Sequence, residues 1–298
     1  MVAVAPLPRV RAADLLELTK PRIVGLVVAT AAAGFYLAAP GGVDLSLFLN
    51  AILGTTLVAA GTNALNQVAE RDVDAIMRRT ARRPLPSGRL APEGASRFAW
   101  ALGIAGISIL SLLVNLTTGL LAAATLGSYV FLYTPLKRRT TLATLVGGIP
   151  GALPIVGGWT AAGGALGVQA WVLFWILFLW QLPHFLALAW LYREDYARAG
   201  FRMLTALDPD GHSTGRQIAL YCTALIPVTL IPTVVGMTGA VYFFGALMLS
   251  AAFCACGVAM ALWQSRVGAR RLFLASITYL PLLLMLMTLD RTLPSGGL

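Results

Sequence analysis

Long apolar stretches separated by short polar connections run through most of this chain. Each stretch is roughly 20 residues long, the length that a helix needs to cross a hydrocarbon layer about 30 Å thick. The stretches are centred near Ala31, Leu57, Ile107, Thr125, Ile149, Phe178, Leu225, Leu249 and Pro281. The pattern therefore predicts an all-α, polytopic membrane protein, a bundle of nine transmembrane helices that forms one domain over residues 1–298.

A weak internal repeat is visible among the nine predicted helices. Residues 20–135 and 140–265 each hold four helices of similar length, and a ninth helix follows at 270–290. In each half the second helix runs into an acidic stretch, at 66–74 and at 192–195. Repeats in membrane proteins commonly place a binding site at the interface between them. We therefore expect the two acidic stretches to face one another.

Composition agrees with a membrane location. Hydrophobic residues make up 58% of the chain and charged residues 11%, with a mean hydropathy of +0.79. These values exclude an ordinary soluble domain. Cys222, Cys254 and Cys256 all lie in apolar stretches and form no CxxC pair, so we interpret them as packing residues.

Charge separates the two predicted sides of the membrane. With nine crossings, the N-terminus and every second connection share one side, and 21 of the 22 Lys and Arg residues fall there, with Arg291 opposite. The positive-inside rule makes this side, and the N-terminus, cytoplasmic, so we expect a multi-pass protein of the inner (cytoplasmic) cell membrane. Ten of the twelve acids lie on the same side, all but Asp44 and Asp290. That rule does not explain the acids, so we expect an active site facing the cytoplasm.

The first acidic stretch has the spacing of a metal site. Asn66, Glu70 and Asp74 follow one another at steps of four, which places them on one face of a helix. An amide and two carboxylates suit Mg²⁺, a hard ion that completes its octahedron with water and phosphate oxygens. The alternative interpretation is that these acids have no ligand and only keep the end of the helix hydrated.

Two basic clusters favour a diphosphate as the companion of this metal. They are Arg78, Arg79, Arg82 and Arg83 after the second predicted helix, and Lys137, Arg138 and Arg139 after the fourth. Guanidinium groups match phosphate oxygens in pairs. In the second acidic stretch, Asp195 or Glu194 could complete a second metal site. His184 lies in an apolar stretch, where it is either a functional group or a hydrogen-bonded structural residue.

Four motifs carry a resemblance that covers nearly the whole chain. They are Thr-Lys-Pro-Arg at 19–22, the stretch 66–85, the segments from Tyr133 to Trp159, and Trp-Gln-Leu-Pro-His-Phe at 180–185 with residues 195–204. With them the chain resembles the UbiA superfamily of intramembrane prenyltransferases. The superfamily usually has aspartate where this chain has Glu70. Its second motif commonly has two aspartates four residues apart. In this chain the residues four before and four after Asp195 are Leu191 and Ala199, and this departure favours the haem-directed branch.

The resemblance implies a reaction and residue roles. In the haem-directed branch a farnesyl group passes from farnesyl diphosphate to a vinyl group of haem b, with water added, giving haem O and diphosphate. The implied catalytic and Mg²⁺-binding residues are Asn66, Glu70, Asp74 and Asp195; the implied diphosphate-binding residues are Arg79, Arg83, Lys137, Arg138, Tyr133 and Lys20; and His184 would bind haem. The expected partners are haem b, farnesyl diphosphate and the lipid bilayer, with haem A synthase or oxidase assembly proteins as further candidates and no nucleic acid.

Other functions remain open at this point. A sister prenyltransferase would act on a quinone precursor or another aromatic or alcohol acceptor, but the block 180–185 argues against it. A secondary transporter would also combine repeated halves with membrane carboxylates. Here the acids lie at the membrane edge beside arginines, which suits a diphosphate better than a transported ion. A purely structural role predicts that the acids are dispensable.

Overall fold

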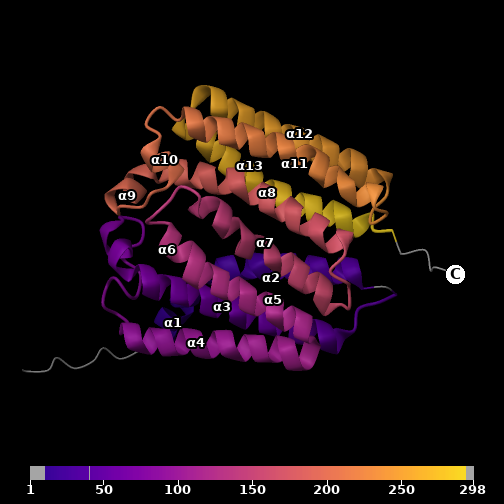
Figure 1. The fold of residues 1–298 in the computed structure, drawn as a ribbon, viewed down its shortest axis with the longest axis horizontal. Coiled ribbons are helices and arrows are strands. Elements are labelled where there is room, and N and C mark those ends of the chain that lie inside the picture. Colours follow the sequence, from indigo (N-terminus) through magenta and orange to yellow (C-terminus); the bar gives the residue numbers. More distant parts are fainter. Residues whose placement is uncertain (1–10, 40, 293–298) are drawn as a thin grey trace, which may run out of the picture.

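The computed structural model describes residues 11–39 and 41–292, so Arg9, one of the cations counted above, lies outside the described residues. Apart from one β-bridge between Thr238 and Arg291, the secondary structure of this part of the chain is helical. The helices are α1 (Ala12–Thr19), α2 (Pro21–Ala38), α3 (Leu45–Ile76), α4 (Pro92–Ile109), α5 (Leu116–Gly127), α6 (Thr134–Leu136), α7 (Ala143–Ala161), α8 (Val168–Leu191), α9 (Arg193–Arg198), α10 (Leu204–Leu207), α11 (His212–Val234), α12 (Ala240–Trp263) and α13 (Arg266–Leu289). Two π-helical segments, Leu110–Val114 and Ser128–Tyr133, extend α4 and α5 (Figure 1).

The prediction of an all-helical, multi-pass membrane bundle is confirmed. Within the described ranges, eight helical segments are long and apolar enough to cross a membrane, and they match eight of the nine expected stretches. The remaining stretch, near Ile149, is α7, which has 19 residues, five of them glycines and two prolines, and is not among these eight segments. It packs against α2, α5 and α8 in the interior of the bundle.

The length of α3 places its acids at the edge of the membrane. Asp44 caps the helix by accepting a hydrogen bond from Leu47 N at 3.0 Å. At 1.5 Å per residue, the 32 residues of α3 extend about 48 Å, whereas the hydrocarbon layer is about 30 Å thick. The segment from Leu45 to Asn66 already spans about 32 Å. An apolar layer that begins at the start of α3 would therefore end near Asn66, before the acids at the end of the helix.

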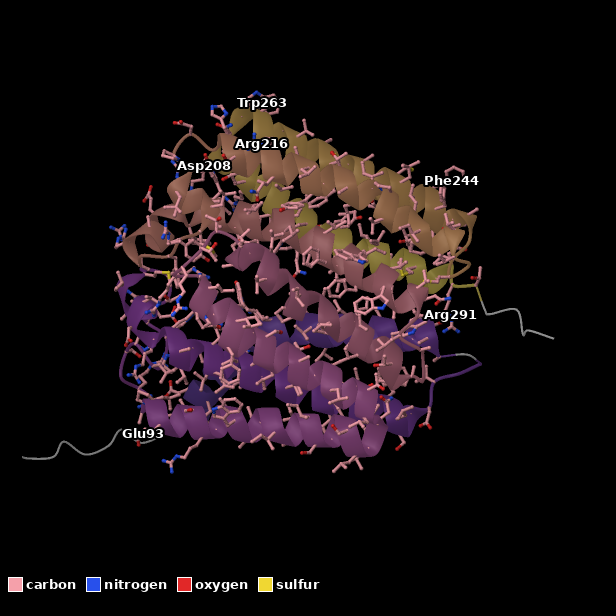
Figure 2. The ribbon with its side chains drawn as sticks, in the orientation of Figure 1. Glu93, Asp208, Arg216, Phe244, Trp263 and Arg291 are labelled. Carbon is pink, nitrogen blue, oxygen red and sulfur yellow. The ribbon has the colours of Figure 1, made fainter. Side chains whose placement is uncertain are left out.

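Charged residues gather where α1, α9, α10 and the connection 77–91 between α3 and α4 lie, and this is called the charged end below. In Figure 2, Glu93, Asp208 and Arg216 lie at this end, whereas Arg291 lies at the opposite end of the bundle. Two apolar cores stabilise the bundle between these ends. One core is formed by α7, α8, α11, α12 and α13, and the other by α1, α3, α4 and α5.

Glycines allow α2 and α7 to pack backbone against backbone. A Cβ atom on Gly34 would lie 2.1 Å from Ile155 O, and one on Gly158 would lie 1.9 Å from Ala31 O. In lipid the hydrophobic effect does not drive helices together, and small residues at such crossings allow the close van der Waals packing that does. The contact between α2 and α7 fixes the position of α7, against which part of the charged end packs.

We predict that Gly34→Ala destabilises the bundle whereas Gly25→Ala does not. Both glycines lie inside α2, so each substitution adds the same helix propensity, about 1 kcal/mol. Only the Gly34 variant forces a side chain onto the backbone of α7, which costs roughly 1–3 kcal/mol; a Cβ on Gly25 has no atom within 4 Å. The midpoint of thermal unfolding in detergent should fall for Gly34→Ala only, and equal midpoints would contradict the close crossing.

Candidate active site

The predicted metal-binding face of α3 is buried. The exposed fractions of Asn66, Glu70 and Asp74 are 2%, 5% and 1%, although the helix end around them is polar. The neighbouring Arg71 and Asp72 point outward and pair with each other at 3.3 Å. One face of this helix end therefore carries charges that water hydrates. The other face carries buried charges, which need ion pairs or hydrogen bonds from the protein.

Each buried carboxylate on this face pairs with a cation from a different connection. Lys137 Nζ lies 2.8 Å from Glu70 Oε1, and Arg83 Nη1 lies 2.6 Å from Asp74 Oδ2. Thr80 Oγ1 also donates to the carbonyl oxygen of Asp74 at 2.8 Å, which fixes the start of the connection that carries Arg83. Two of the predicted diphosphate-binding residues therefore meet the predicted metal-binding residues directly.

The amide of Asn66 joins a third cation to the group. Its Oδ1 accepts from Lys20 Nζ at 3.2 Å, and its Nδ2 donates to Thr134 Oγ1 at 3.2 Å. Thr134 donates in turn to Tyr129 O at 2.9 Å, five residues earlier, at the end of the π-helical segment. Such π-helical insertions frequently occur at functional sites. Here the insertion directs the Thr134 hydroxyl toward α3.

Lys20 reaches the site because the backbone turns sharply between α1 and α2. It has a left-handed conformation with φ of 54°, which is unusual for a residue other than glycine, and Pro21 starts α2 directly after it. Burial lowers the pKa of the Lys20 ammonium to about 7, and repulsion by Arg83 and Lys137 acts in the same direction against the attraction of Glu70 and Asp74. Cations thus crowd Lys20, and an anionic ligand between them would relieve this repulsion.

Tyr133 supports Lys137 rather than extending toward solvent. Lys137 Nζ lies 4.5 Å from the centre of the Tyr133 ring, a cation–π contact. On its other side the ring fills the space above Gly147 of α7, where an added Cβ would lie 2.5 Å from a ring carbon. The position of Lys137 therefore depends on a glycine of α7.

The remaining predicted cations lie further out. Arg79 is exposed; its guanidinium carbon lies 4.8 Å from the centre of the Tyr192 ring, and it donates to Tyr196 Oη at 3.5 Å. Arg138 is exposed beside Lys137. The backbone N–H of Arg202 donates to Lys137 O at 2.9 Å, which joins the connection after α9 to the site.

The donor set fits a hard divalent ion. Asp74 Oδ1 is buried with no hydrogen-bond partner, so one carboxylate oxygen is left for another ligand. Asp195 lies on α9, where it pairs with Arg198 at 3.1 Å. No three His, Cys, Asp or Glu side chains of residues 11–39 and 41–292 come together as a metal site, so Asp195 does not join Glu70 and Asp74 in one.

His184 lies apart from this group, against α13. Its Nδ1 is 2.7 Å from Ser276 Oγ, and its ring stacks between Trp180 and Phe273, with ring centres 5.3 and 4.9 Å away. Trp180 Nε1 donates to Ser276 O at 2.9 Å. The histidine is thus held in a fixed orientation by aromatic rings and one hydroxyl.

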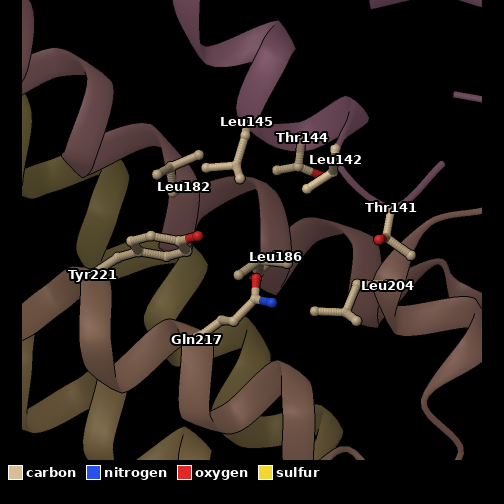
Figure 3. A pocket seen from close by; sticks show the side chains of 9 residues that line it. All are labelled: Thr141, Leu142, Thr144, Leu145, Leu182, Leu186, Leu204, Gln217 and Tyr221. Carbon is tan, nitrogen blue, oxygen red and sulfur yellow. The ribbon is translucent and has the colours of Figure 1, made fainter. Parts of the chain in front are cut away.

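A separate small cavity of about 30 Å³ lies between α7, α8, α10 and α11 (Figure 3). Leu145, Leu182 and Leu186 supply apolar lining, and Gln217 and Tyr221 of α11 add polar groups. None of the predicted site residues lines it. The cavity is therefore distinct from the group around Asn66.

Several residues that shape the site have no local signal in the sequence. Gly147 supports Tyr133, Ser276 orients His184, and Arg89 was counted only as one cation among many. Their partners lie between 14 and 92 residues away and on other elements, so spacing along the chain cannot reveal them. Only the packing of α7, α13 and α1 shows their roles.

Comparison with known proteins identifies relatives of this chain and of its fold. Residues 27–283 match the UbiA prenyltransferase family. A protoheme IX farnesyltransferase of Solibacter usitatus is 51% identical over 287 residues, which cover 93% of this chain and 98% of that protein. The structure of a digeranylgeranylglyceryl phosphate synthase has a TM-score of 0.79 at 16% identity, covering 93% of this chain and 97% of that one. A UbiA homologue from Archaeoglobus fulgidus, solved with GPP and Mg²⁺, has a TM-score of 0.68 at 13% identity, covering 92% and 99%.

We predict that Lys137→Met destabilises the protein through Glu70. The substitution leaves a buried carboxylate without its cation, which costs about 3–5 kcal/mol. Adding Glu70→Gln removes the stranded charge, so the double variant should regain most of the lost stability. Thermal unfolding of the two single variants and the double variant measures this coupling. Additive losses would mean that the pair in this structure does not interact.

Proposed function

The chain belongs to the UbiA prenyltransferase family, and from this we propose that it transfers a farnesyl group from farnesyl diphosphate to a vinyl group of haem b. Water is added in the same reaction, and haem O and diphosphate are released. The identity of 51% with a protoheme IX farnesyltransferase supports this choice of substrates. The observation that carries the proposal is the buried group of Asn66, Glu70 and Asp74 enclosed by cations from three connections.

The cations Lys20, Arg83 and Lys137 would bind the diphosphate. Contacts to α3 fix all three side chains before any ligand arrives, so the charges of Arg83 and Lys137 are already in place where negative charge develops on the leaving group. A bound diphosphate would favour the charged form of Lys20, whose pKa is lowered to about 7 without it. Arg79, held against Tyr192 and Tyr196, would add charge from the outer side, and Arg138, exposed next to Lys137 in the sequence, would add charge as well. Arg83 and Lys137 belong to connections outside α3, whereas their carboxylate partners lie on α3. A diphosphate that enters between them can share these two cations with the carboxylates.

Asn66, Glu70 and Asp74 would hold Mg²⁺, and Asp195 of the second acidic stretch, which does not join them in one site, would hold a second ion. The middle glutamate keeps the charge of the usual aspartate on a longer side chain. When bound, the ion neutralises charge on the leaving diphosphate and aligns it. The free oxygen of the Asp74 carboxylate supports this assignment.

Transfer begins when the bond between farnesyl C1 and oxygen breaks and its electron pair leaves with the diphosphate. The electron-rich vinyl carbon of haem b then forms a bond to C1. Water adds to the neighbouring carbon, which carries the new positive charge, and loses a proton. The protein's part is to stabilise the departing anion with preorganised charge in a site that excludes bulk water.

His184 is our proposed haem ligand. The hydroxyl of Ser276 donates its single proton to Phe273 O at 2.6 Å, so Ser276 Oγ can only accept from His184 Nδ1. This network assigns the neutral tautomer with its proton on Nδ1, which leaves the Nε2 lone pair free to bind iron. The same logic fixes metal-binding histidines elsewhere, where the other ring nitrogen donates to a protein oxygen.

We also propose that α7 is the ninth crossing, so that the N-terminus and the charged end face the cytoplasm. The charge difference between the two ends supports this orientation. The membrane would then be the inner cell membrane. Haem A synthase and oxidase assembly proteins are candidate partners, since they use the product of this reaction.

We predict that purified protein given haem b, farnesyl diphosphate and Mg²⁺ forms a product heavier than haem b by a farnesyl and a hydroxyl group. A chelator should stop the reaction, and added Mg²⁺ should restore it. Asp74→Asn should lower kcat by about a hundredfold or more, since it weakens charge placed for the leaving group. Mass spectrometry of the product measures each of these outcomes.

Asp72→Asn is the matched control, because Asp72 is an exposed aspartate two residues away on the same helix. It should leave the rate unchanged. Full activity of Asp74→Asn, or of chelated enzyme, would defeat the proposed mechanism. A prenylated product from an aromatic acceptor but none from haem b would assign the chain to the sister activity.

We predict that His184→Ala lowers haem affinity and shifts the Soret band of bound haem b. Ser276→Ala should have a smaller effect of the same kind, because it frees the tautomer without removing the ligand. His212→Ala provides the control, since His212 is exposed and contacts Gln264. Spectroscopic titration with haem b measures all three variants. An unchanged spectrum in His184→Ala would rule out ligation by this residue.

A further inference from the structure

Arg89 joins two parts of the charged end with one guanidinium group. Its Nη1 pairs with Asp14 of α1, and its Nη2 lies 2.8 Å from Glu17 Oε2 of the same helix. On the other side, Nη2 donates to Arg82 O at 2.9 Å and Nε donates to Ser87 Oγ at 3.1 Å. All three guanidinium nitrogens therefore contact protein groups. Together they join α1 to the connection 77–91. Asp14 is only 3% exposed, so one of the two carboxylates that Arg89 contacts is buried, whereas Arg89 itself is partly exposed and Glu17 is exposed.

The first of these elements, α1, ends at Lys20. The N–H of Lys20 donates to Glu17 O at 3.2 Å, and its side chain then reaches Asn66 Oδ1. Leu18 is fully buried in the core with α3, and its backbone carbonyl oxygen accepts a hydrogen bond from Gln67 Nε2 at 2.7 Å. A shift of α1 would therefore displace the ammonium group from the site.

The second element is the connection 77–91, which carries Arg83. The backbone carbonyl of Arg83 accepts from Ser87 N at 3.0 Å and from Ser87 Oγ at 2.7 Å. Ser87 is thus held both by Arg83 and by Arg89. The backbone position of Arg83, whose side chain pairs with Asp74, depends on this small network.

We propose that Arg89 is a positioning residue that sets Lys20 and Arg83 on the two sides of the α3 face for binding of a diphosphate. It does not contact the ligand itself; it ties α1 to the connection 77–91 and so fixes the spacing of the two cations. This inference rests on the proposed diphosphate site and adds a residue to it.

The chemistry of the contact requires arginine. Four acceptors lie around the group in different directions, and the planar guanidinium fork can meet them together, whereas a lysine ammonium offers one point of charge on a flexible stem. Only a rigid fork transmits the position of one element to the other. Lysine at this position would retain the charge and lose the spacing.

The test is binding of inorganic pyrophosphate with Mg²⁺ to the purified full-length protein, measured by calorimetry, together with steady-state kinetics. Arg89→Met should raise the Kd of pyrophosphate roughly tenfold, the lower end of what one misplaced charge-assisted hydrogen bond costs. The KM for farnesyl diphosphate should rise similarly, while the KM for haem b stays constant. Arg89→Lys should raise the Kd by about threefold.

Arg97→Met and Arg97→Lys are the matched controls. Arg97 is an exposed cation of α4 at the same end, and in the part of the chain that the structure describes it makes no ion pair. Both controls should keep the wild-type Kd, which separates positioning from loss of net charge.

The outcomes decide between positioning and mere support of the fold. If Arg89 only stabilises the protein, its variants lose folded material but the folded fraction binds pyrophosphate with the wild-type Kd, and the proposal is overturned. If Arg89→Met does not fold, Arg89→Lys against Arg97→Lys gives the answer alone. Failure to prenylate haem b with intact pyrophosphate binding would overturn the proposed acceptor and leave the role of Arg89 standing.

Discussion

Two carboxylates buried at the end of one long helix set the requirement that the rest of the charged end fulfils. An ionised carboxylate that leaves water loses several kcal/mol unless a cation and further hydrogen bonds replace its hydration. Glu70 and Asp74 obtain these partners from Lys137 and Arg83, which belong to different connections. The pairs therefore determine where the connections lie. They also leave positive charge, with Lys20, around a face that suits a metal diphosphate.

Helix packing deep in the membrane determines how accurately these charges are placed. The glycine contacts between α2 and α7 bring their backbones together, and α7 in turn supports the Tyr133 ring beneath Lys137. A one-residue change in this contact would move a charge that lies well away from it. The bundle is thus more than an anchor: its close crossings are part of the geometry of the site.

The sequence was sufficient for the features that repeat along one helix and insufficient for those that depend on contacts between helices. Apolar stretches predicted the spans, and steps of four predicted the shared face of Asn66, Glu70 and Asp74, because both follow from helix geometry. The glycine- and proline-rich α7 was recognised as a helix by its apolar pattern. Contacts such as those of Arg89 depend on α1 lying against the connection 77–91, which no local pattern specifies.

The end of the bundle opposite the site is fixed in a different way. Arg291, the only cation there among the residues that the structure describes, donates to the carbonyl oxygens of Tyr36 and Ala39 at the end of α2. Asp290 accepts from Tyr242 N at 2.6 Å. These contacts tie the end of α13 to α2 and α12, and they bind backbone groups that no ligand displaces. At the charged end the cations instead hold side-chain carboxylates, for which a diphosphate can compete, so the two ends differ in how readily an anionic substrate can rearrange them.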